Sequence, residues 1–179
     1  EKNLEVAAEA LTNAFAADTT NAKNALTLGQ VLSAQGKIDE AIEAFQHAAW
    51  NGQEQAAKTQ MSGTYLKVAS AALKAGKMAD AIKAANTANS FAENANAYLI
   101  AGQASQKLNK ASDAVENFTK YLELKPDAAN ASAITYTVAA LYQTALKNNG
   151  KALEYYNKIK DDAKFGAQAK AQIAALGGK

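Results

Sequence analysis

Residues 95–128 read ANAYLIAGQASQKLNKASDAVENFTKYLELKPDA, and this stretch decides the fold. Its second half carries apolar residues at steps of three and four, which is the spacing of one face of an α-helix. Asn109-Lys110 separates the two halves, and asparagine is one of the few residues that take the left-handed conformation with which helices end. The stretch therefore predicts two amphipathic helices joined by a tight turn.

The same unit recurs along the chain. The segments DEAIEAFQHA, ADAIKAANTA and SDAVENFTKY align at Ala41, Ala81 and Ala114, and weaker copies align at Ala7 and Ala152. The spacings are 34, 40, 33 and 38 residues, which fit a repeat of roughly 34 residues with insertions. Because a single pair of such helices leaves its apolar faces exposed, neighbouring pairs are expected to stack and bury them.

Small and large residues alternate where the helices are expected to cross. The aligned alanines are followed four residues later by a larger or equally small side chain, namely Phe45, Ala85, Phe118 and Tyr156. In the first helices, Leu28-Gly29 and Ala101-Gly102 would let backbones approach closely. Aromatic residues one turn earlier are expected to be buried in the same stack: Tyr65, Tyr98 and Tyr136.

Composition excludes several classes of protein. The 179 residues include 45 Ala and a single Pro, which favours helices over sheets. The absence of Cys excludes disulfides and thiolate metal sites. No run of 18 apolar residues occurs, so no membrane-inserted segment is expected. The chain begins at Glu1, which implies a processed or trimmed upstream segment; the compartment stays unknown, with an exported or periplasmic location favoured over a cytoplasmic one.

These motifs resemble the tetratricopeptide repeat. Residues 95–128 carry its pattern at Tyr98, Ala101-Gly102, Ala114, Phe118 and Pro126, and residues 22–55 carry Leu28-Gly29, Leu32, Ala41 and Phe45. The resemblance implies an all-α fold, a right-handed α-α superhelix of helical hairpins. We expect one repeat domain over 1–179, made of a half repeat at 3–17, repeats at 22–55, 62–95, 95–128 and 133–166, and a capping helix at 167–176 followed by fraying residues 177–179.

Turns and insertions can also be placed. Left-handed turn residues are expected at Gly36, Gly76 and Asn109 and within Asn148-Asn149-Gly150. The insertions near residues 56–61 and 129–132 contain helix-forming residues, so each is expected to lengthen the first helix that follows it. The acidic pairs Asp39-Glu40 and Asp161-Asp162 are expected at helix starts, where carboxylates complement the helix dipole.

Few residues suggest chemistry. His47, the one histidine, lies between Phe45 and Trp50 on a helix and is expected to be a partly exposed structural residue. We therefore expect no catalytic residue, no cofactor and no metal; an enzymatic role would require a catalytic domain upstream. The lysines are scattered and Arg is absent, so nucleic-acid binding is not expected either.

The resemblance implies a binding groove lined by the first helices. Amides there would hydrogen-bond a peptide backbone and leucines would receive its apolar side chains, although those leucines could equally pack on neighbouring repeats. Leu26, Leu66 and Leu99 stand where chaperone-cochaperone relatives carry Lys, so a clamp for a terminal carboxylate is not expected. The predicted groove residues are Leu26, Gln30, Ser33, Leu66, Ser70, Leu73, Lys74, Asn96, Leu99, Gln103, Gln106, Lys107, Thr137 and Leu141.

The sequence thus predicts a non-enzymatic scaffold that binds a partner protein or an extended peptide on the concave face of the superhelix. The alternative is an envelope accessory protein that supports carbohydrate uptake or outer-membrane assembly, which exposed aromatic residues in the groove would favour. The unpaired helix at residues 3–17 is also expected to leave an apolar edge, which either pairs with another copy to form a homodimer or is covered by upstream sequence.

Overall fold

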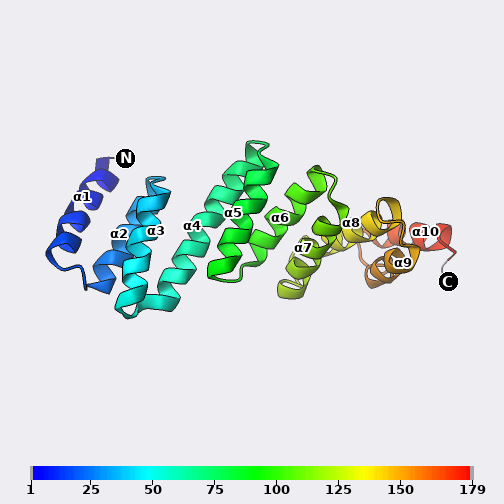
Figure 1. Cartoon of the computed structure of the whole chain (residues 1–179). Coiled ribbons are helices and arrows are strands. Elements are labelled where there is room, and N and C mark those ends of the chain that lie inside the picture. Colours follow the sequence, from blue (N-terminus) through cyan, green and yellow to red (C-terminus); the bar gives the residue numbers. More distant parts are fainter. Residues whose placement is uncertain (1, 178–179) are drawn as a thin grey trace. The chain divides into compact units, whose positions relative to one another are not determined.

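The computed structural model describes residues 2–177, and no β-strand occurs among them. The fold is therefore all-α and built from helical hairpins, as the sequence predicted (Figure 1). The helices are α1 (Lys2–Ala17), α2 (Ala22–Ala34), α3 (Ile38–Ala48), a short π-helix η1 (Ala49–Gln53), α4 (Glu54–Lys74), α5 (Met78–Phe91), α6 (Ala95–Lys107), α7 (Ala111–Leu124), α8 (Ala131–Thr144), α9 (Asn149–Lys158) and α10 (Gly166–Ala175).

Two compact units make up the chain. Unit 1 contains residues 2–68 and 87–94, and unit 2 contains residues 69–86 and 95–177. In unit 1 the α2–α3 hairpin packs against α1, while unit 2 holds the α6–α7 and α8–α9 hairpins, with α10 against α9. The repeat boundaries inferred from the sequence, and the assignment of 1–179 to a single domain, stay a prediction.

The core of unit 1 confirms the predicted alternation of small and large residues. Ala41 and Phe45 are both fully buried, and Leu28 and Leu32 of α2 pack into the same cluster. A Cβ atom added to Gly29 would lie 2.5 Å from Cε1 of the Phe45 ring. The glycine is therefore required because the aromatic ring occupies the space of its missing side chain.

Unit 2 repeats this arrangement. Ala114 is fully buried and Phe118 is 1% exposed, while in the next hairpin Ala152 and Tyr156 take the same two places. A Cβ atom on Gly102 would lie 2.6 Å from Cδ1 of Phe118. In the α5 copy of the pattern, Ala81 and Ala85 are likewise fully buried.

Three predicted turns are confirmed and the last differs. Gly36, Gly76 and Asn109 have φ values of 79°, 76° and 58°. Before α9, however, the left-handed residue is Lys147, with φ of 53°, rather than a member of Asn148-Asn149-Gly150. Asn148 instead caps α9, since its side-chain oxygen accepts a hydrogen bond of 3.0 Å from the Lys151 backbone N–H.

The two insertions behave differently. The first lengthens α4 to 21 residues, as expected, although a kink at η1 precedes the helix. The second adds only two residues to α8, which begins at Ala131, rather than the one or two turns expected. Pro126 follows the end of α7, and Asn130 accepts a hydrogen bond from the Tyr121 hydroxyl, so residues 125–130 form turns instead.

Smaller differences concern the C-terminal end and the tyrosines. The closing helix α10 begins at Gly166, one residue before the predicted start. Residues 178 and 179, which belong to the segment expected to fray, lie outside the described residues. Asp39 and Glu40 stand in the first turn of α3, whereas Asp162 lies in the turn ahead of α10 and accepts hydrogen bonds from two backbone N–H groups there. Side chains expected to be buried are only half-buried: Tyr65, Tyr98 and Tyr136.

Ser105 of α6 provides a test of the packing. Its side chain is fully buried, and its hydroxyl has no hydrogen-bond partner among the described residues. Because an unpaired buried hydroxyl is unfavourable, Ser105→Ala is expected to raise the free energy of unfolding by about 1 kcal/mol. Urea denaturation followed by circular dichroism measures the change.

Ser33→Ala is the matched control. Ser33 is also buried, but its hydroxyl lies 2.9 Å from the hydroxyl of Thr64, to which it is hydrogen-bonded. Removing it leaves Thr64 without that partner, so the control is expected to lose about 1 kcal/mol. A Ser105→Ala protein that unfolds at lower urea than the wild type would contradict the assignment of an unpaired hydroxyl.

Candidate functional site

The predicted groove residues of unit 1 lie on α2 and α4. Leu26 and Leu66 are half-buried, and Leu26 packs against the core of the unit. Gln30 is exposed and makes no hydrogen bond within the described part of the chain. Ser33 is 8% exposed and is engaged with Thr64. Among the predicted groove residues of unit 1, therefore, Gln30 has the polar side chain that is available to a ligand.

The remaining predicted residues belong to unit 2. At the end of α4, Ser70 and Leu73 are half-buried and Lys74 is exposed. On α8, Thr137 and Leu141 are half-buried; the Thr137 hydroxyl donates a 2.9 Å hydrogen bond to the carbonyl of Ala133, and Leu141 packs on the core. The Thr137 hydroxyl therefore donates its hydrogen bond within its own helix and not to a ligand.

Helix α6 carries the most accessible set. Asn96, Gln106 and Lys107 are exposed, Gln103 is half-buried, and Leu99 is half-buried against the same core as Leu141. The side chains of Gln103, Gln106 and Lys107 form no hydrogen bond or ion pair with any described residue. Each amide offers both a donor and an acceptor, which is what the backbone of an extended peptide requires.

The clearest hollow of unit 2 lies elsewhere, between α7, α8 and α9. It has a volume of about 480 Å³, and its apolar lining residues include Leu122, Pro126 and Ile159. A second hollow of about 340 Å³ lies further along α7, beside Tyr142 and Leu146. Tyr155 and Thr119 line both hollows, and their hydroxyls lie 3.2 Å apart, so this hydrogen bond stands between them.

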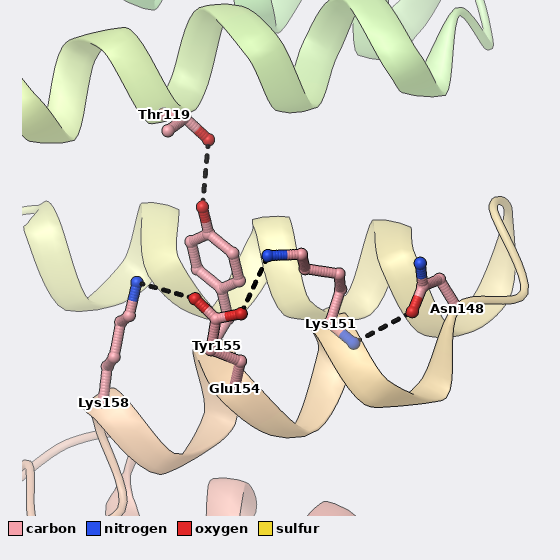
Figure 2. Close-up of polar contacts among 6 residues, drawn as sticks. All are labelled: Thr119, Asn148, Lys151, Glu154, Tyr155 and Lys158. Carbon is pink, nitrogen blue, oxygen red and sulfur yellow. Dashed lines mark hydrogen bonds and ion pairs between the residues drawn. The ribbon is translucent and has the colours of Figure 1, made fainter.

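Paired charges lie on α9, and one of them, Lys158, lines the larger hollow. Figure 2 shows the Glu154 carboxylate between Lys151, at 2.9 Å, and Lys158, at 3.6 Å. The hydrogen bond from Lys151 lowers the pKa of the Glu154 carboxyl, and Glu154 in turn raises the pKa of the Lys151 ammonium. The Lys158 ammonium also lies 4.2 Å from the centre of the Tyr155 ring, within the range of a cation–π interaction.

Other polar groups of the larger hollow are occupied too. Ser132 donates a 2.6 Å hydrogen bond to Asp162, which together with the backbone N–H groups of Phe165 and Lys164 lowers the pKa of that carboxyl. Thr135 donates to the carbonyl of Ala131. A ligand in this hollow would have to displace existing interactions, whereas the side-chain amides of Gln103 and Gln106 on α6 have no hydrogen-bond partner among the described residues. Sequence reasoning did not point to the hollow.

His47 is a structural residue in this geometry. Its ring lies edge-on between Phe15, 5.1 Å away, and Trp50, 5.3 Å away, measured between ring centroids. Within residues 2–177 no three histidine, aspartate or glutamate side chains are grouped so that they could hold a metal ion. In the same range, no helix combines the length and the apolar character needed to cross a bilayer.

Comparison with known proteins supports the repeat assignment. A family model described as Tetratricopeptide repeat matches residues 22–49 and 95–128. Among solved structures, MamA AMB-1 superimposes with a TM-score of 0.53 at 19% identity, covering 93% of this chain and 88% of that one. Another crystal structure of MamA gives a TM-score of 0.50 at 18% identity, covering 97% and 92%. A search of curated proteins gave no match.

The matched segments coincide with the helical hairpins α2–α3 and α6–α7. In each of these hairpins a glycine of the first helix packs against a phenylalanine ring of the second. These two segments of the chain are therefore tetratricopeptide repeats. At 18–19% identity the likeness to MamA establishes the fold and nothing more.

Proposed function

We propose that this protein is a non-enzymatic scaffold that binds an extended segment of a partner protein along its first helices, with α6 as the principal contact of unit 2. The observation that supports it most directly is the set of unpaired groups on α6. Gln103, Gln106 and Lys107 have no partner within residues 2–177, although they stand on a rigid, well-packed helix.

The chemistry of this surface suits a peptide backbone. Gln103 and Gln106 are separated by three residues and so lie on the same side of the helix. Leu99, one turn before Gln103, is half-buried and offers apolar surface beside them. Because the helix is already ordered, the protein loses little conformational entropy on binding.

A displayed library of random peptides tests the proposal. Peptides that bind the wild-type chain are selected, and their affinity is then measured for a Gln103→Ala, Gln106→Ala double variant. Losing two backbone hydrogen bonds, each worth about 0.5–1.5 kcal/mol, is expected to weaken binding by about tenfold. The matched control is Gln168→Ala, which removes an exposed amide from α10.

Two results would contradict the proposal. One is a library that yields no binder for the folded wild-type chain. The other is a selected peptide that binds the double variant and the Gln168→Ala control equally well, which would place the contact away from α6.

Two other hypotheses, homodimerisation through α1 and a role in the cell envelope, stay predictions. On α1, Leu4 and Val6 are 37% and 66% exposed, and this apolar edge is what a homodimer through residues 3–17 would cover. Sedimentation velocity of the wild type and of a Val6→Glu variant tests that idea. The role in carbohydrate uptake or outer-membrane assembly has no supporting observation among the groove residues, which include no aromatic side chain.

A further inference from the structure

The junction between α3 and α4 contains an exposed Asn-Gly pair. Asn51 has φ and ψ of −100° and 28°, and Gly52 has φ of 95°, so the backbone leaves the helical conformation at both residues. A Cβ atom placed on Gly52 would have no neighbour within 4 Å. The peptide bond between the two residues is consequently open to solvent and uncrowded.

We infer that Asn51 is a site of spontaneous covalent modification, namely deamidation through a succinimide. The backbone nitrogen of Gly52 attacks Cγ of Asn51 and loses its proton to solvent. The new C–N bond closes a five-membered ring while the Cγ–Nδ2 bond breaks and ammonia leaves. Water then opens the ring at either carbonyl, which leaves aspartate or isoaspartate. Asparagine is among the thermally labile residues for this reason.

A second Asn-Gly pair in the chain serves as an internal comparison. Asn149-Gly150 has the same chemistry but forms the first two residues of α9. The Asn148 side chain caps that turn through the backbone N–H of Lys151, 3.0 Å away. Ring closure needs rotation about the Cα–C bond of the asparagine, and helical hydrogen bonding restricts that rotation. The structure therefore makes Asn51 the faster of the two sites.

Deamidation at Asn51 would remove a contact of the folded chain. The Asn51 side-chain nitrogen donates a 2.8 Å hydrogen bond to the carbonyl of His47 and a longer one, 3.5 Å, to the carbonyl of Thr19. A carboxylate in its place has no proton to donate and faces two carbonyl oxygens. The turn between α1 and α2, which contains Thr19, would then lose its tie to η1.

The chain carries its own reporter of this change. Trp50 is the single tryptophan, it is 74% exposed, and it precedes Asn51 directly. Loss of the Asn51 contacts is expected to shift the emission of Trp50, because its ring packs only against His47 among the described aromatic residues. Trp50 fluorescence thus reports the loss of the Asn51 contacts, whereas the deamidation itself is measured by mass.

The experiment ages the full chain in mildly alkaline buffer at physiological temperature and follows both sites by peptide mapping. Trypsin releases residues 38–58 and cleavage after glutamate releases residues 124–154. We expect deamidation and isoaspartate at Asn51 to form about tenfold faster than at Asn149, a barrier difference of about 1.4 kcal/mol. In denaturant the two rates are expected to converge. Equal rates in the folded chain, or a faster Asn149, would overturn the proposal.

Two variants complete the test. Asn51→Gln keeps the amide but makes ring closure slow, so ageing is expected to leave both its mass at position 51 and its Trp50 emission unchanged. Asn51→Asp is expected to show the shifted emission from the start. If aged wild type is deamidated at Asn51 while its Trp50 emission stays that of fresh protein, the predicted loss of the contacts with His47 and Thr19 is wrong.

Discussion

Phe118→Ala is expected to lower the free energy of unfolding by about 3–5 kcal/mol. Phe118 is 1% exposed and lies in the cluster formed by α7, α8 and α9 together with Gly102 of α6. Removing its ring leaves a cavity in a closely packed core, and the surrounding side chains can relax only partly into it. Urea denaturation followed by circular dichroism gives the size of the loss.

Gly102→Ala distinguishes this packing from a general core effect. In the wild-type background the new Cβ atom would lie 2.6 Å from the Phe118 ring, so the substitution is expected to cost about 1–3 kcal/mol by overpacking. In the Phe118→Ala background the ring is absent, and the same substitution is expected to stabilise the helix by about 0.5–1 kcal/mol.

The reversal of sign is the decisive outcome. A coupling of this size between two substitutions is typical of residues in contact and is not expected of distant, independent sites. Gly29 and Phe45 form the same pair in unit 1, at 2.5 Å, and serve as an independent repetition of the cycle. If Gly102→Ala were destabilising to the same extent in both backgrounds, the close approach of α6 to the Phe118 ring would be refuted.

Those pairs were visible in the sequence because their spacing repeats. Alanine at the helix crossing and an aromatic residue four positions later follow from the geometry of one helix face, and both copies with phenylalanine pack as predicted. Local rules of this kind identify which residues meet within a hairpin. They also located the turns at Gly36, Gly76 and Asn109, where glycine or asparagine favours a positive φ.

Residues that act against their own preference were not predictable. Lys147 adopts a φ of 53° although lysine rarely does so, because Asn148 is used as the cap of α9. Gly52, at a φ of 95°, instead follows the preference of glycine, and the Asn51-Gly52 pair is a turn signal from which this kink could have been predicted. At Lys147 the packing of whole helices decides the backbone, and a pattern within one segment carries no record of it.

The groove residues show the same limit. Their positions on the first helices followed from the resemblance, but Ser33 is buried against Thr64, which no single-helix pattern indicates. The hollows beside Tyr155 were missed for a related reason. Adjacent tyrosines must point about 100° apart on a helix, so with Tyr156 in the core Tyr155 turns toward α7. The adjacent pair Tyr155-Tyr156 is the sequence signal that could have suggested the contact between Tyr155 and α7.

Tyr156 is expected to make stability fall at high pH. Its side chain is 1% exposed, and its hydroxyl donates a 2.8 Å hydrogen bond to Gln143, which in turn donates to Gln172. Burial, with the neighbouring Tyr136 adding to it, raises the pKa of Tyr156 from 10.0 to about 12. Between these two values the unfolded chain binds fewer protons than the folded one, so stability decreases as pH rises.

The expected loss is about 2–3 kcal/mol between pH 10 and pH 12, since each pKa unit corresponds to about 1.4 kcal/mol. The full contribution is present below pH 10, where Tyr156 is neutral in both states. Tyr156→Phe removes this titration but leaves the Gln143 oxygen without its donor, at a cost of about 1–2 kcal/mol near neutral pH.

Wild type and Tyr156→Phe should therefore differ most near neutral pH and converge, or cross, as the pH approaches 12. Chemical denaturation at a series of pH values gives this difference, in which the other titrating groups cancel because both proteins share them. Absorbance of the tyrosinate measures the ionisation directly in the folded wild type. A difference between the two proteins that stays constant across the alkaline range would show that Tyr156 ionises equally readily in the folded and unfolded chains, and that its burial against Gln143 is wrong.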